Sequence, residues 1–142
     1  MIFRAGILMV MYVGIVLSGM SPAWAQQEGI VIELNKAESA PAGCQLHFNV
    51  HNTTNTKFEV FSVDLVFFDA DGVMSLRSLV SFGRLYPNKH HFNNWVFPSI
   101  DCANVGRILV NTIQQCQTDG GVTFDCLSVL STSHKGAIEL VK

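Results

Sequence analysis

Charged residues are scarce in this sequence, and no part of it is rich in charge of one sign. Only 14% of the 142 residues are Asp, Glu, Lys or Arg, and the formal net charge is −2. Lysine and arginine do not cluster, so the chain lacks the basic patch with which proteins bind nucleic acid or an anionic membrane. We therefore expect neither of these as the main partner.

Catalytic motifs are also missing. There is no G-x-S-x-G sequence and no glycine-rich phosphate loop, and the serines and histidines have no diagnostic spacing. Two carboxylates can be chosen from eleven in many ways, so a pair such as Glu59 and Asp64 indicates no acid–base site. The sequence favours a non-enzymatic protein that needs no cofactor.

Long apolar runs are absent except at the start of the chain, which has the pattern of a secretory signal peptide. Arg4 supplies a positive charge, residues 6–17 are apolar, and the A-W-A sequence at 23–25 fits the small-x-small pattern that signal peptidase reads. Cleavage is therefore expected between Ala25 and Gln26. Residues 1–25 would then be a targeting sequence rather than part of the fold.

The alternative is an uncleaved anchor, because residues 2–20 could almost span a membrane. Ser21 and Pro22 disfavour helix just before the cleavage point, which favours removal. No second run of about 18 apolar residues follows, and no twin arginine is present, which favours the Sec route. We expect a single periplasmic domain of residues 26–142, without stable membrane insertion after cleavage.

The four cysteines all lie after the signal sequence, and none forms a C-x-x-C motif, which disfavours a zinc knuckle and a redox pair. An even number of cysteines in a small exported domain indicates disulfides, with three connectivities open for four cysteines. Cys116 and Cys126 flank a polar stretch with a Gly-Gly turn, so a bond between them closes a short loop at little entropic cost. That pairing leaves Cys44 with Cys102. The sequence thus predicts two structural disulfides.

Apolar and polar residues alternate with the period of β-strands along most of the remaining chain. The alternation is clearest at residues 44–52, where every second residue is apolar. The expected strands are residues 30–34, 44–52, 58–68, 73–82, 92–97 and 107–113, with 36–43 and 83–88 as connections and 101–106 as a short helical turn. Residues 124–130 and 137–141 are either edge strands or a covering segment. Short strands with turn signals every 8 to 14 residues predict an all-β fold, a single antiparallel β-sandwich.

Three motifs in this pattern have a known counterpart. They are V-x-N-x-T beginning at Val50, F-D-x-x-G at residues 68–72, and L-Y-P-N at residues 85–88, where Asn88 stands in place of the usual glycine. Over residues 44–97 the chain resembles the immunoglobulin-like modules of bacterial envelope proteins of the FxLYD type. With its signal peptide and four cysteines, it is similar to a group of small exported proteins of alphaproteobacteria. The resemblance implies an immunoglobulin-like sandwich and supplies no catalytic residue.

Four histidines suggest a metal or small-ligand site as an alternative function. His47 and His51 share the polar face of one expected strand, about 13 Å apart, and His90 and His91 are adjacent on another. Imidazoles from neighbouring strands could hold Cu²⁺ or Zn²⁺. However, the first two are too distant to share an ion directly, and adjacent strand residues point to opposite faces. Solvated surface histidines are the competing interpretation.

Aromatic residues suggest the main functional hypothesis. The chain has ten phenylalanines, more than one sandwich core needs, and several fall at strand ends. An exposed aromatic patch marks a protein contact or a peptide added to a sheet edge. We expect an envelope protein as partner and Phe58, Phe68 and Trp95 as the contact region. The alternative is burial on both faces, with the C-terminal segment covering the outer one.

Overall fold

The computed structural model describes residues 28–142, where every regular element except one short helical turn is a β-strand. The elements are β1 (Ile30–Ala40), β2 (Gly43–Asn52), β3 (Phe58–Phe68), β4 (Met74–Leu85), β5 (Lys89–Phe97), the 3₁₀ helix η1 (Cys102–Asn104), β6 (Arg107–Thr118), β7 (Leu130–His134) and β8 (Glu139–Val141). The all-β prediction is confirmed. No helix in this part of the chain is long and apolar enough to cross a membrane. The signal peptide and its cleavage between Ala25 and Gln26 lie outside the described residues.

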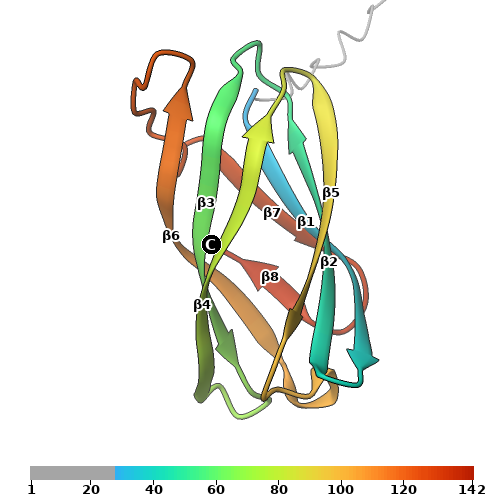
Figure 1. Ribbon diagram of the computed structural model, residues 1–142. Helices are drawn as coiled ribbons and strands as arrows, with labels where there is room; N and C mark the ends of the chain where they lie inside the picture. The colour runs from blue at the N-terminus through green and yellow to red at the C-terminus, as the bar shows by residue number, and fades with distance from the viewer. Residues whose placement is uncertain (1–27) are drawn as a thin grey trace, which may run out of the picture.

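Two four-stranded sheets pack against each other around one hydrophobic core (Figure 1). One sheet has the order β5-β2-β1-β7 and the other β4-β3-β6-β8. Side chains of a strand point alternately to its two faces, and in β2 the residues Cys44, Leu46, Phe48 and Val50 are fully buried while their neighbours are not. The same alternation that predicts the strand therefore fixes which of its faces joins the core.

The prediction of a purely antiparallel sandwich is wrong at the C-terminus, because both sheets are mixed. β7 runs parallel to β1, with Ile30 beside Leu130, and β8 runs parallel to β6. These strands have five and three residues, so their own sequences say little about direction. Each of these short strands lies at the edge of its sheet, β7 beside β1 and β8 beside β6.

Two expected connections are shorter than predicted, because strands continue through bulges. β1 extends to Ala40 with a register shift after Leu34, so only Pro41 and Ala42 remain as the turn instead of residues 36–43. β4 likewise continues to Leu85. Gly83 lies at a bulge in it with φ of 71°, a conformation that glycine adopts without strain.

Other local predictions have mixed outcomes. The helical turn is confirmed as η1, in which the backbone N–H of Ala103 donates to the carboxylate of the N-cap residue Asp101. Asn88 has φ of 54°, so it adopts the left-handed conformation for which the FxLYD-type pattern uses glycine. Residues 124–129 form no strand, and 126–129 are turns, because the second disulfide and local hydrogen bonds hold this segment in a loop.

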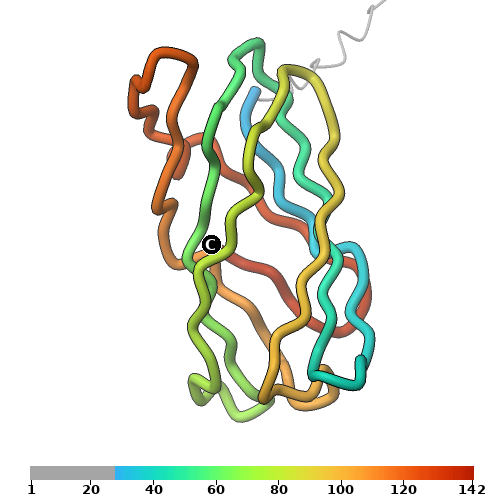
Figure 2. Tube along the Cα trace, viewed as in Figure 1, coloured from blue at the N-terminus to red at the C-terminus, as the bar shows by residue number. Residues whose placement is uncertain are grey.

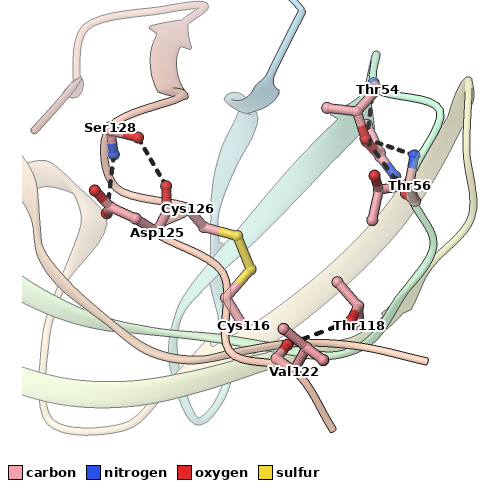
Figure 3. The surroundings of a disulfide bond; sticks show 9 residues. Thr54, Thr56, Cys116, Thr118, Val122, Asp125, Cys126 and Ser128 are labelled. Atoms are coloured by element: carbon pink, nitrogen blue, oxygen red, sulfur yellow. Dashed lines mark hydrogen bonds between the residues drawn. A yellow bond between two sulfur atoms is a disulfide. The ribbon is translucent and has the colours of Figure 1, made fainter. Parts of the chain in front are cut away.

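The two disulfides have the predicted pairing. Cys44–Cys102 joins the start of β2 to η1, and Cys116–Cys126 joins β6 to the loop that follows it. This loop projects beyond the end of β6 (Figure 2). In Figure 3 the Thr118 hydroxyl donates a hydrogen bond to the Val122 carbonyl at 3.3 Å, so the turn is held by the side chain as well as by the disulfide.

Candidate functional site

The two sides of the sandwich differ in how their edge strands are protected. On one side the short strands β7 and β8 lie against each other, and on the other the long strands β4 and β5 form the edges of the two sheets (Figure 1). Within residues 28–142, β5 pairs only with β2 and β4 only with β3. Their outer backbone N–H and C=O groups are therefore available to another strand.

Of these two long edges, β5 has fewer features that prevent pairing with another chain. Residues 90–97 contain no proline and no Asp, Glu, Lys or Arg. The side chain of Phe92 is 69% exposed and that of Val96 is 41% exposed. In contrast, β4 has Arg77, Arg84 and the bulge at Gly83. Charged side chains and bulges commonly prevent a sheet edge from pairing with another strand. The β5 edge is therefore better suited than β4 to accept a partner.

The outer face of β5 and β2 is neutral and polar around Phe92. The cross-strand register gives four outward pairs, namely Gln45 with Val96, His47 with Asn94, Asn49 with Phe92, and His51 with His90. A hollow of about 200 Å³ is lined by His47, Phe92, Asn93 and Asn94. We call the eight residues of the four outward pairs the β5 face; four of them lie on β5 and four on β2. It offers an exposed aromatic ring flanked by amide and imidazole groups.

The four predicted metal-binding histidines do not meet in one place. His91 points to the opposite face of β5 from His90, and its Nε2 accepts the backbone N–H of Tyr86 at 3.1 Å. His47 lies on the β5 face, but its Nε2 is bound to the Glu38 carboxylate at 2.7 Å. No group of three or more His, Cys, Asp or Glu residues positioned for a metal is found in residues 28–142.

His51 and His90 are the two histidines that the fold brings together. They are directly opposite in the β2–β5 register, and their rings stack with centroids 3.8 Å apart and planes 14° apart. Partial burial, and secondarily the neighbouring His90, lower the pKa of His51. The His51 imidazole is therefore held neutral more readily than an isolated surface histidine would be.

The predicted contact residues Phe58, Phe68 and Trp95 are not brought together either. Phe58 and Phe68 lie at opposite ends of β3. Phe58 is fully buried, and the centroid of its ring is 5.8 Å from that of Phe124. Phe68 lies under the guanidinium group of Arg107 at 5.3 Å. Trp95 is half-buried against two core rings. Of the three, only Trp95 belongs to the β5 edge, on its inner side.

Sequence reasoning did not identify Asp64 as a residue of interest, although its carboxylate is the most deeply placed charge in the described chain. The side chain is 6% exposed on the outer face of β3. Arg77 of β4 donates to it through Nε at 2.9 Å and Nη2 at 2.8 Å, and Asn111 of β6 donates at 2.8 Å. The three residues thus tie neighbouring strands together, which is a structural role. An apolar–polar pattern that breaks down in a central strand is the signal that could have indicated it.

Hydrogen bonds from Arg77, and then from Asn111, hold the pKa of Asp64 below its usual range. A carboxyl whose pKa is lower in the folded state stabilises the fold above its unfolded-state pKa of about 4, and this contribution is lost as pH falls through the folded pKa. We expect Asp64→Asn to lower the free energy of unfolding at pH 7 and to flatten its decline below about pH 4. Urea unfolding at several pH values measures both effects.

The matched control is Asp71→Asn in the exposed β3–β4 turn, which should keep the pH dependence of the unmodified protein. If Asp64→Asn also keeps that dependence, the ion pair does not contribute as described.

The structure defines the chain as an all-β protein with two mixed four-stranded sheets and two disulfides. No protein-family model matches its sequence, and no curated protein does. Among solved structures, it is similar to IrmA from Escherichia coli, with a TM-score of 0.52 and 18% sequence identity over 75% of this chain and 92% of that one. At this identity the likeness concerns the fold alone.

Proposed function

We propose that this chain is a non-enzymatic periplasmic interaction module with an immunoglobulin-like sandwich, which binds an extended segment of another envelope protein along the β5 edge. The observation that carries the proposal is the long β5 strand, which is unpaired on one side and lacks charge over residues 90–97. The exposed Phe92 and Val96 give an added strand apolar side chains to pack against.

Export to the periplasm is supported by the signal-peptide pattern and by the cysteines. The four cysteines form two disulfides, and no cysteine in residues 28–142 is free. Such crosslinks persist in an oxidising compartment and are rare in the cytosol. The resemblance to FxLYD-type modules and to small exported proteins of alphaproteobacteria supports the same location.

Binding by strand addition follows from the geometry of the edge. A partner strand beside β5 would form main-chain hydrogen bonds with its free side, and these supply affinity without regard to sequence. Alternate partner side chains would then contact the β5 face at Phe92 and Val96, and the others would reach the half-buried Trp95. The favoured partner is therefore an extended segment with aromatic or β-branched residues at every second position.

The experiment compares Phe92→Lys with Val122→Lys. Phe92 is 69% exposed on β5, and Val122 is 63% exposed in the disulfide-closed loop. Each substitution therefore places a lysine at an exposed apolar position. A photo-crosslinking residue at Asn94 should capture a defined partner in the periplasm. Because lysine guards an edge by its charge, Phe92→Lys should lower the crosslinked yield about tenfold or more, the size of a 1.4 kcal/mol loss, and Val122→Lys should not.

Slower hydrogen exchange of the β5 amides in the isolated complex is the second expected result, because strand addition protects those N–H groups. Equal crosslinking by both lysine variants, or protection confined to other strands, would exclude the β5 edge as the binding site.

A further inference from the structure

We propose that His51 and His90 form a two-histidine site for a divalent transition-metal ion, with Cu²⁺ bound most tightly and Zn²⁺ more weakly. The site lies on the outer side of β2 and β5, and it does not depend on strand addition. The observation behind this proposal is that the two imidazoles lie directly opposite each other on β2 and β5 and are stacked.

The two rings are near enough to reach one ion together. Two imidazole nitrogens bound to one metal at about 2.0–2.1 Å lie about 2.8–3.4 Å apart for angles between square-planar and tetrahedral. The ring centroids of His51 and His90 are 3.8 Å apart. Imidazole lone pairs lie in the ring plane, and the two planes are only 14° apart, so the rings must rotate out of the stack before one nitrogen of each faces a shared ion. His90 is exposed and His51 half-buried, so solvent gives the rings room for this rotation.

A neighbouring amide prepares one of the two ligands. Nδ1 of His90 is 3.0 Å from Oδ1 of Asn49, which lies two residues before His51 on the same face. Because an amide oxygen only accepts hydrogen bonds, the ring donates from Nδ1, and Nε2 is the nitrogen that the neutral ring offers to a metal. A hydrogen bond to the second ring nitrogen is the usual way in which proteins orient a metal-binding histidine.

The other histidines near this edge are already engaged, which restricts the site to this pair. His47 is bound to Glu38 and His91 accepts from Tyr86. Two imidazoles at an open strand edge leave the remaining coordination positions to water. Imidazole ligands favour Cu²⁺ over Zn²⁺ in the general order of divalent ions, which gives the expected ranking.

The test is isothermal titration of Cu²⁺, and separately Zn²⁺, into the chain purified from the periplasm, in a buffer that does not bind metal. We expect one ion per chain. His51→Gln and His90→Gln should each weaken binding about tenfold or more, because loss of one ligand removes the chelate. The matched controls His47→Gln and His134→Gln should leave it unchanged. The double variant His51→Gln/His90→Gln should bind little more weakly than either single variant.

The electron paramagnetic resonance spectrum of the Cu²⁺ complex is the second readout, and it should show coupling to two imidazole nitrogens in the unmodified chain and to one or none in the variants. Circular dichroism checks that each variant is folded. Unchanged affinity in either single variant, or an equal loss in a control variant, would overturn the proposal, as would a spectrum without two imidazole nitrogens.

Discussion

Replacing Cys44 and Cys102 together by alanine is expected to lower the free energy of unfolding by about 4 kcal/mol, because the disulfide closes a 58-residue separation and restricts the unfolded chain accordingly. The second disulfide closes a separation of only ten residues, so removing Cys116 and Cys126 should cost about 3 kcal/mol. Urea unfolding of both double variants without reductant measures the two losses.

The short-range pair is the control for the long-range one, since each substitution removes the same number of atoms. Cys44 and Cys116 are both buried, so the cavity left by each is similar. A larger loss for the short-range pair would show that the difference in loop length does not determine the stabilisation. Equal losses would lead to the same conclusion.

The second large effect is expected in the aromatic core beneath the β5 edge. Phe48 is fully buried, and the centroid of its ring is 5.8 Å from that of Phe82 and 5.9 Å from that of Trp95. Phe48→Ala should therefore lower the free energy of unfolding by about 3–5 kcal/mol, through lost burial and the cavity that remains. Phe92→Ala on the neighbouring strand is the control, and because its ring is exposed we expect a change within about 0.5 kcal/mol.

Thermal and urea unfolding of the two alanine variants would check this contrast, and similar stability of both would mean that the cluster is not part of the cooperative core. The result also governs how Trp95 is tested as a contact residue. Because Trp95 packs against Phe82 at 5.1 Å, Trp95→Ala affects the same cluster. Loss of partner binding in that variant is informative only where the variant is shown to be folded.

Where one face of a strand is buried and the other is open, the sequence predicts the strand well. β2 is such a strand, and its alternation from Cys44 to Val50 matches the structure residue by residue. β3 is central in its sheet, and its outward residues Ser62, Asp64 and Val66 are also covered. Burial on both faces removes the alternation, so neither its register nor the Asp64 ion pair could be predicted.

The candidate site was predictable only in part, for a related reason. Alternation correctly separates His90 from His91 and places His47 and His51 on one face. Which residues meet across strands depends on the register between β2 and β5, and a long connection through β3 and β4 separates these strands in the chain. The stack of His51 on His90 therefore needs the fold. Phe58 is buried and packs against Phe124, which is distant in sequence, so its position at a strand end wrongly predicted it at the surface.

The parallel pairing of β7 with β1 has a consequence for the order in which the protein can be assembled. Ile30 at the start of the domain lies beside Leu130 near its end, and β8 completes the other sheet only with the last residues, Glu139–Val141. A chain that emerges N-terminus first can form the β1–β2 hairpin early, but both sheets remain incomplete until its final strands are released. Contacts this distant in sequence also form slowly. The strand order therefore leaves neither sheet complete until residues 130–141 are available for pairing.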